Sequence, residues 1–512
     1  MKKQSLIKGS LILGLAGILA RFLGLFFRWP LIMLIGDEGI GYYQMSYPLY
    51  MFFIAMASGL PVAMSKMISE RNALNDINGS FQVMKESSYL MISIGAGTTL
   101  ALFFFAKPII SFLKWDSKAY YSLIAISFAP FVISFTTIFR GFFQGLQNMT
   151  PSAISQILEQ IGRVVFGVGL AILMLPKGIE YSAGGAAFGA TAGAVLGGTY
   201  LFSKYRKVKK SYRIKKIKTN TDVLNSILKI ALPISLGTTV GSIMNLIDSI
   251  LVPQKLLQAG LNNTKATVLY AQLTGKAAVI TNIPLTLSMA ICTSLIPIIA
   301  ENYILNKRLE LKNRIDAAMK MAAVIALPCA FGLFFLADPI LNLIFPGRAD
   351  GASILKYLSI SIPFIIITQT TTSILQGIGH YIKPVINLFI GCIIKIILTS
   401  MLVCIPELNI YGAVIASIGA YITASILNLI TLKICLKVTI NFFEILVKPC
   451  LSATIMMICV LLSYNRIYKT IGSNGVSCLV SIFLGIIVYI LLIVVFKVFE
   501  VDEIKKRIKR KS

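Results

Sequence analysis

Fourteen long apolar stretches occupy most of this 512-residue chain and leave it few folds to adopt. A helix that crosses a membrane needs about 20 mostly apolar residues, and each stretch reaches that length between charged residues, prolines or glycines. The stretches are continuously apolar instead of alternating, which favours helices over the strands of a barrel. Only 13% of the residues are charged, which excludes a soluble globular protein. The sequence therefore predicts an all-α polytopic membrane protein with about 14 transmembrane helices.

The predicted spans form two groups of six and a final pair. The first six cover residues 9–35, 42–68, 83–106, 118–145, 151–175 and 181–203. The next six cover residues 223–251, 267–300, 313–337, 352–378, 385–405 and 411–434. The last two cover residues 443–464 and 475–498.

The second group repeats the first at an offset of 231 to 233 residues. Pro108 matches Pro339, and Ser-Phe-Ala-Pro-Phe at 127–131 matches Ser-Ile-Pro-Phe at 361–364. Many transporters build a site near the middle of the membrane from repeated hydrophobic halves. We therefore predict two pseudosymmetric six-helix lobes plus two C-terminal helices, and we interpret the chain as a transporter.

Charge and repetition together predict the organisation of the chain. The predicted parts are a first lobe at 1–203, a basic linker at 204–221, a second lobe at 222–436, two additional helices at 437–498 and a basic tail at 499–512. Lys and Arg collect in cytoplasmic loops, and they are concentrated in the linker and the tail. Both termini are therefore predicted to lie in the cytoplasm.

The remaining composition argues against other classes of protein. Topology and contact with anionic lipids explain the net charge of +28, so we predict no nucleic-acid partner. The eight cysteines contain no Cys-x-x-Cys pair and are interpreted as core residues. His380 is the one histidine, which excludes a His-based metal site and a catalytic triad. We predict no enzyme activity and no cofactor, apart from a coupling cation or proton that the sequence does not identify.

Charged side chains inside the first span suggest a site, because an ionisable group in a membrane is costly unless it faces a cavity or a partner. Spacings of 3, 4, 3 and 4 place one stripe of small and cationic residues on a helix face, namely Gly14, Gly17, Arg21, Gly24 and Arg28. The glycines could pack against another helix, and Arg28 could extend to the interface. Neither explains Arg21, so we predict a cationic cavity wall.

The fifth span carries a second polar stripe. Ser152, Gln156, Glu159 and Arg163 are spaced 4, 3 and 4. Glu159 can pair with Arg163 one turn later, and a purely structural ion pair is an alternative.

The repeat keeps the cation of this stripe and loses the carboxylate. At an offset of 232, Glu159 corresponds to Gly391 and Arg163 to Lys395, while Asn387 takes the place of Ser155. Two cations at equivalent positions are better explained by an anionic ligand than by two independent ion pairs. Arginine suits bidentate contact with phosphate, and lysine supplies a point charge. The predicted diphosphate-binding residues are Arg21, Arg28, Arg163 and Lys395.

Further polar residues are candidates for lining the cavity or for coupling. Asp248 in the seventh span can neutralise Lys276 in the eighth, bind a coupling cation or lie near the interface, and these alternatives stay open. The complete set of such candidates is Gln156, Glu159, Asn245, Asp248, Gln272, Lys276 and Asn387.

Several segments resemble the stage V sporulation protein B family. They include Arg21-Phe-Leu-Gly-Leu-Phe-Phe-Arg28-Trp-Pro, Leu34-Ile-Gly-Asp-Glu-Gly-Ile-Gly-Tyr-Tyr-Gln44 and Ser155-Gln-Ile-Leu-Glu-Gln-Ile-Gly-Arg-Val164. The resemblance spans nearly the whole chain. This family is a polysaccharide-export branch of the multidrug/oligosaccharidyl-lipid/polysaccharide exporter superfamily, which also contains the lipid II flippases.

The resemblance implies that a monomer moves a polyprenyl-diphosphate-linked saccharide across the bacterial cell membrane by alternating access. Lipid II or a similar peptidoglycan precursor, for the spore cortex, is the implied substrate, and membrane lipids are the other partners. Arg21 and Arg28 look like the first-helix arginines that line a cationic cavity in lipid II flippases. Trp29 stands where those flippases carry an acidic residue, so a role of that carboxylate is not carried over.

Three other functions compete with transport of a lipid-linked saccharide. Cation-coupled multidrug efflux needs carboxylates and aromatic rings, and the excess of intramembrane cations argues against it. A membrane-embedded glycan polymerase needs catalytic carboxylates at a membrane surface, whereas the predicted external acidic residues are scattered over short loops. A scaffold that transports nothing would not need buried charge.

Overall fold

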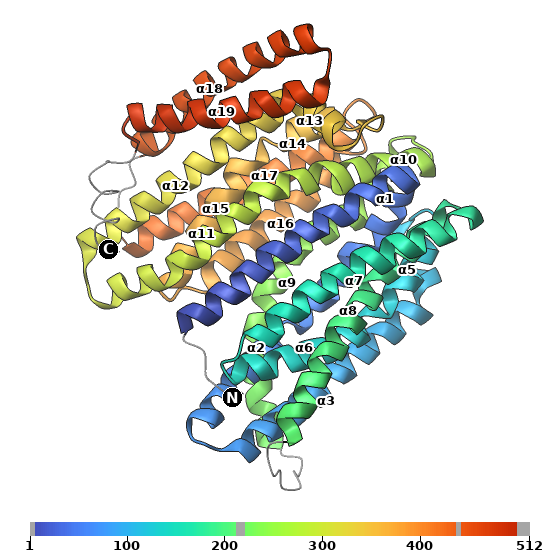
Figure 1. The fold of residues 1–512 in the computed structure, drawn as a ribbon, viewed down its shortest axis with the longest axis vertical. Coiled ribbons are helices and arrows are strands. Elements are labelled where there is room, and N and C mark those ends of the chain that lie inside the picture. The colour runs from blue at the N-terminus through green and yellow to red at the C-terminus, as the bar shows by residue number, and fades with distance from the viewer. Residues whose placement is uncertain (1–5, 211–220, 437–441, 499–512) are drawn as a thin grey trace. The chain divides into compact units, whose positions relative to one another are not determined.

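The computed structural model of the protein describes residues 6–210, 221–436 and 442–498. The side chains of a few helical residues, Arg21 among them, also lie outside the described part. The described residues form nineteen α-helices, a short 3-10 helix and a π-helical turn, with no strand among them (Figure 1). The predicted all-α class is confirmed.

The chain divides into two compact units, Met1–Ala271 and Gln272–Ser512. The helices of the first unit are α1 (Leu6–Ala57), α2 (Gly59–Ala73), α3 (Ile77–Phe104), α4 (Ala106–Leu113), α5 (Ala119–Ser127), α6 (Ala129–Gly145), α7 (Thr150–Met174), η1 (Leu175–Lys177), α8 (Ile179–Lys210), α9 (Thr221–Gln258) and α10 (Asn263–Ala271). Those of the second unit are η2 (Gln272–Ala277), α11 (Ala278–Ile304), α12 (Arg308–Phe335), α13 (Ala337–Ile344), α14 (Ala352–Leu358), α15 (Ser361–Gly377), α16 (Ile382–Leu402), α17 (Ile410–Leu436), α18 (Phe442–Ile471) and α19 (Asn474–Val495).

The first helical stretch, Ile12–Ala73, accounts for two of the predicted spans. Its 62 residues would measure about 93 Å as one straight helix, roughly three times the hydrocarbon thickness of a bilayer. Gly36 interrupts it with φ 66° and ψ −171°, a conformation that glycine adopts at little cost. The rings of Phe27 and Tyr43, on either side of this break, are 6.0 Å apart. The chain therefore reverses direction at Gly36.

The other predicted spans have matching helices. Twelve helical stretches among the described residues are long and apolar enough to cross a membrane. The pair α14 and α15, bent by 42°, counts as a thirteenth if the two helices form one span. Counting the first stretch as two crossings gives the fourteen that the sequence predicts.

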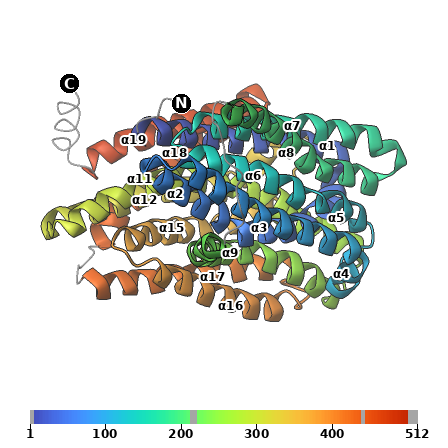
Figure 2. The same cartoon turned by 90° about the horizontal axis from the view of Figure 1, so that it is seen from below.

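The internal repeat is visible in how the helices pack. In the first unit α3 packs on α6, and both α6 and α7 pack on α8. In the second unit α12 packs on α15, and both α15 and α16 pack on α17 (Figure 2). The short helices α4 and α13 have eight residues each and follow the long helices α3 and α12. The predicted pseudosymmetric six-helix halves are thus present in the fold.

Helices α9 and α10 group with the first unit by their contacts, since α9 packs on α1 and α2. The sequence repeat assigns residues 222–271 to the second lobe. The lobe boundaries at 203 and 222 therefore stay predictions. The prediction for the basic linker falls largely on residues 211–220, outside the described residues, and so does the tail from residue 499 onwards.

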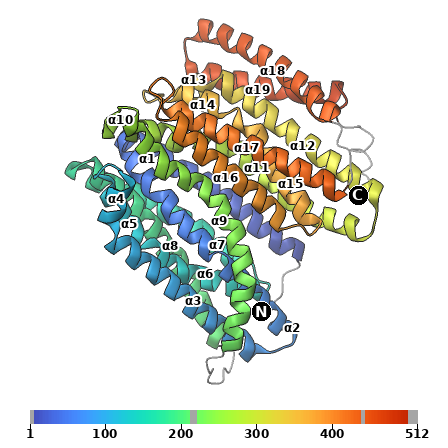
Figure 3. The same cartoon turned by 180° about the vertical axis from the view of Figure 1, so that it is seen from behind.

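Helices α18 and α19 follow the repeat and pack against each other, α18 also on α12 and α19 on α13 (Figure 3). Met456 and Val460 of α18 and Tyr489 of α19 share a buried apolar cluster with Leu336. The Tyr489 hydroxyl donates a hydrogen bond to the carbonyl oxygen of Val324, 3.0 Å away. These contacts fix the additional pair onto the second unit.

Candidate functional site

The first unit contains a carboxylate between two guanidinium groups. Arg140 Nη2 on α6 lies 2.8 Å from Glu159 Oε2 on α7 and donates a hydrogen bond to it. Arg163 Nη2, one turn after Glu159, lies 3.9 Å from Glu159 Oε1. The predicted pair of Glu159 and Arg163 is therefore present, but Arg140 is the closer partner of the carboxylate.

Serines of α7 hold Arg140 in place. Arg140 Nε donates to Ser155 Oγ at 2.8 Å, and Ser152 Oγ donates to the backbone carbonyl of Arg140 at 3.2 Å. The side chains of Arg140 and Glu159 are 17% and 12% exposed, so little water screens their attraction. The Arg140 side chain is thus fixed by two polar contacts to α7.

Close packing of α7 on α8 sets the position of this part of α7 (Figure 1). A Cβ added at Gly193 of α8 would collide with the carbonyl oxygen of Glu159, and one at Gly162 would lie 2.9 Å from the Gly193 Cα. Small residues let membrane helices approach this closely. The glycines of α8 therefore define where the charged residues of α7 stand.

Three tyrosines of α1 lie beside these charges. Tyr43 and Tyr47 stack with ring centroids 5.4 Å apart, and the centroids of Tyr47 and Tyr50 are 5.8 Å apart. Arg28, before the reversal at Gly36, places its Cζ 5.8 Å from the centroid of the Tyr43 ring, within cation–π distance. Arg163 also interacts electrostatically with Tyr43. Arg28 and Arg163 thus lie in the neighbourhood of the same tyrosines of α1.

Each of these arginines has one buried guanidinium nitrogen that lacks a hydrogen-bond acceptor among the described residues. Arg28 Nη1 and Arg163 Nε have no hydrogen-bond partner within the described ranges. A buried N–H without a partner is costly, and guanidinium groups bind phosphate oxygens well. The arrangement can therefore hold an anion.

The other predicted residues of the first unit take different positions. Arg21 lies on α1 two turns before Arg28, and its side chain is outside the described part. Gln156 is half-buried on α7, Asn245 is exposed on α9, and Asp248 is buried one turn later.

The second unit has a network of neutral polar side chains in the corresponding part of the repeat. Asn387 on α16 donates through Nδ2 to Asn428 Oδ1 at 2.9 Å and to Thr431 Oγ1 at 3.0 Å. Asn428 on α17 donates to Thr371 Oγ1 at 3.2 Å and to Thr372 Oγ1 at 3.1 Å on α15. At an offset of 232, Thr372 occupies the position of Arg140 in the repeat.

Lys395 is buried on α16, two turns after Asn387. It occupies the repeat position of Arg163. The cation is thus retained inside the second unit, while the carboxylate and the Arg140 equivalent are replaced.

Lys276 and Gln272 lie in the π-helical turn η2. The Lys276 ammonium is buried and donates to the backbone carbonyls of Arg348 at 2.7 Å and Asp350 at 3.2 Å. It therefore braces the loop before α14. Pairing of Asp248 with Lys276 stays a prediction. In the described residues no three His, Cys, Asp or Glu side chains gather as a metal site would require.

Comparison with known proteins gives a consistent result. A family model described as polysaccharide biosynthesis protein matches residues 6–303, and one described as MatE matches residues 272–401. The chain is 29% identical to stage V sporulation protein B of Bacillus subtilis, over 99% of this chain and 98% of that protein. It is 27% identical to the lipid II flippase MurJ of the same organism, over 84% of this chain and 83% of the flippase.

A solved structure has the same fold. The lipid II flippase MurJ in an inward closed conformation aligns with a TM-score of 0.74 at 18% identity, over 95% of this chain and 99% of that chain. The two proteins therefore share a fold.

Proposed function

The chain belongs to the polysaccharide biosynthesis protein family, within the superfamily of multidrug, oligosaccharidyl-lipid and polysaccharide exporters, and we propose that it flips a polyprenyl-diphosphate-linked saccharide across the cytoplasmic membrane. Lipid II or a related peptidoglycan precursor is the proposed substrate, because the relatives named above include a lipid II flippase and a sporulation protein. Both termini are proposed to lie in the cytoplasm.

The observation that carries the proposal is the pair of unsatisfied guanidinium donors around Tyr43. Arg28 Nη1 and Arg163 Nε are buried without partners in the described part of the chain. Arg140 holds Glu159 at 2.8 Å, so the carboxylate does not engage the Arg163 Nε. Three guanidinium groups and one carboxylate leave the cluster with an excess of positive charge, which suits a diphosphate.

The tyrosines beside the arginines suit contact with the sugar part of the lipid head group. Tyr43, Tyr47 and Tyr50 form a column of neighbouring rings along α1, of which the Tyr47 ring is partly exposed and the other two are buried. Hydroxyls can exchange hydrogen bonds with sugar hydroxyls. In this proposal the diphosphate contacts Arg28 and Arg163, with Arg21 and Lys395 as further cations. The sugars occupy the hydrated cavity of the transporter, and the prenyl tail stays in lipid.

Release on the far side requires that the affinity for the head group falls in the second state of the transporter. A membrane potential or an exchanged cation could supply that difference, and we propose no cofactor. Asp248, Asn245 and Gln272 are the proposed candidates for such coupling.

Flipping in proteoliposomes tests the proposal. Fluorescent lipid II and a polyprenyl-diphosphate sugar without peptidoglycan character would be reconstituted separately, and external quenching would report the translocated fraction. We expect Arg28→Ala, Arg163→Ala and Arg21→Ala each to lower the rate at least about tenfold, since a hydrogen bond to a charged group contributes about 1.5–3 kcal/mol.

Arg314→Ala is the matched control, because Arg314 is an exposed arginine of α12. It should flip at the wild-type rate. Wild-type rates in both Arg28→Ala and Arg163→Ala would refute the cationic site. A preference for the second lipid over lipid II would correct the substrate and keep the site.

Multidrug efflux is the second candidate, because the MatE model matches residues 272–401. Such a site would use a carboxylate for a cationic drug, but Glu159 is already held by Arg140. Transport of a cationic dye by the same proteoliposomes, unaffected by Arg28→Ala, would favour this candidate.

A further inference from the structure

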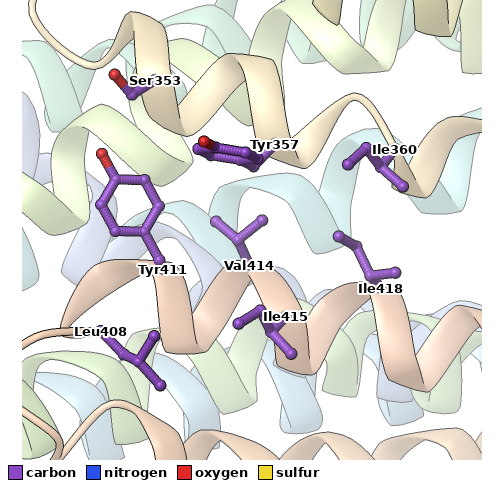
Figure 4. Close-up of a pocket in the computed structure, with 8 residues that line it drawn as sticks. All are labelled: Ser353, Tyr357, Ile360, Leu408, Tyr411, Val414, Ile415 and Ile418. Carbon is purple, nitrogen blue, oxygen red and sulfur yellow. The ribbon is translucent and has the colours of Figure 1, made fainter.

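A groove of about 510 Å³ lies in the second unit, between α14 and α17 (Figure 4). Ser353 and Tyr357 on α14 and Ile360 just after it form one wall, and residues of α17 with Leu408 form the other. This groove is separate from the charged cluster of the first unit, and none of the residues assigned to flipping lines it.

The two ends of the groove differ in chemistry. The hydroxyls of Ser353 and Tyr411 lie at one end, and Ile360 and Ile418 lie at the other (Figure 4). Tyr357 packs edge-on against Tyr411, with ring centroids 5.7 Å apart. The groove therefore fits a molecule that has a polar end and an apolar chain.

A lysine next to Tyr357 adds positive charge beside the groove. Lys356 Nζ lies 5.7 Å from the ring centroid of Tyr357 and 4.9 Å from that of Phe334. These ring contacts leave its ammonium without a carboxylate, since no ion pair of Lys356 occurs in the described part of the chain. An anionic head group would complement this charge.

The groove follows α17 from its first turn towards the middle of the helix. Tyr411 is the second residue of α17, and Ile418 lies about 10 Å further along the helix axis. Ile360 and Ile415 are 39% and 42% exposed, so the apolar end is open to its surroundings. Tyrosine and lysine at the beginning of a span are typical of the lipid head-group level.

The volume limits the length of the chain that fits. If a methylene group takes roughly the 30 Å³ of a water molecule, the groove holds roughly 17 of them. That is close to one phospholipid acyl chain and much less than a long polyprenyl chain. We propose that the groove binds one anionic phospholipid, with its phosphate beside Lys356, Tyr411 and Ser353 and one acyl chain along Ile360, Ile415 and Ile418.

Site-specific photocrosslinking tests this proposal on the full-length chain. p-Benzoylphenylalanine would replace Ile418, and the protein would be reconstituted in equal parts of phosphatidylglycerol and phosphatidylcholine. Mass spectrometry would identify the captured lipid. We expect phosphatidylglycerol to be enriched about fivefold, because one lysine near an anionic head group contributes about 1 kcal/mol.

Two variants make the result specific. Lys356→Gln should return the captured lipids to their ratio in the membrane. The same photoreactive residue at Ile426, which is 50% exposed on α17 two turns further along, should capture the bulk ratio throughout. The proposal would be overturned if position 418 captured the two phospholipids in their membrane ratio, or if the enrichment survived Lys356→Gln. Capture of a polyprenyl lipid or of another polypeptide would also overturn it. Flipping is not measured, so the outcome is independent of the proposed function.

Discussion

Arg140 and Glu159 lie 19 positions apart on different helices, yet Arg140 Nη2 is 2.8 Å from Glu159 Oε2. Arg163 shares a helix with Glu159 but lies 3.9 Å from the carboxylate. Electrostatic attraction falls with distance, so Arg140 provides most of the compensation for the buried carboxylate. Arg163 is thereby left with a donor for a ligand.

Arg140→Met should destabilise the protein more than it changes ligand specificity. The substitution leaves Glu159 with one distant partner, and removal of one member of a buried pair costs roughly 2–3 kcal/mol where some solvent contact remains. Thermal unfolding in detergent would show a lower midpoint. Adding Glu159→Met should restore most of the midpoint, because both charges are then gone. A wild-type midpoint in Arg140→Met alone would contradict the assignment of Arg140 as the main partner of the Glu159 carboxylate.

Arg163→Lys and Arg163→Ala should separate charge from geometry at the proposed ligand site. Lysine keeps the positive charge but lacks the planar fork that binds two phosphate oxygens. We expect intermediate flipping for Arg163→Lys and little for Arg163→Ala, at similar unfolding midpoints. Equal loss in both would mean that the fork geometry is indispensable, and full activity in both would remove Arg163 from the site.

The sequence predicted the chemistry of this cluster in part. Spacing along one helix was enough to pair Glu159 with Arg163, because residues four apart share a helix face. Arg140 was missed because its contact joins two helices, which spacing cannot reveal. The available signal was an arginine inside the predicted span 118–145 whose repeat position holds Thr372.

The number of crossings was predicted well, whereas the helix breaks were not. The break between α5 and α6 falls at Phe128, and that between α14 and α15 falls at residues 359–360. Each lies just before a proline in the first turn of the next helix, Pro130 or Pro363, whose nitrogen cannot donate the backbone hydrogen bond that would continue the preceding helix. The sequence repeat identifies these prolines as matching positions, but hydrophobicity alone does not predict that a span bends there.

Gly193→Ala should disturb the cluster without replacing a charged residue. The new Cβ would collide with the Glu159 carbonyl oxygen and lie 2.9 Å from the backbone nitrogen of Arg163, so α7 and α8 must separate. Overpacking of this kind costs about 1–3 kcal/mol, visible as a lower unfolding midpoint and slower flipping. Gly169→Ala on α7 is the control, because nothing lies within 4 Å of its added Cβ. Equal midpoints for the two variants would show that the contact between α7 and α8 tolerates the added methyl group.

Lys276→Met should loosen the loop at residues 345–351. The buried Lys276 ammonium donates to the carbonyls of Arg348 and Asp350, and methionine fills similar space but cannot donate. Since each hydrogen bond to a charged group contributes about 1.5–3 kcal/mol, backbone hydrogen exchange in the loop should accelerate about tenfold or more. Lys265→Met on the exposed surface of α10 should leave exchange in this loop unchanged. If Lys276→Met also leaves it unchanged, the backbone turns of the loop are enough to hold it and the Lys276 contacts are not needed for its stability.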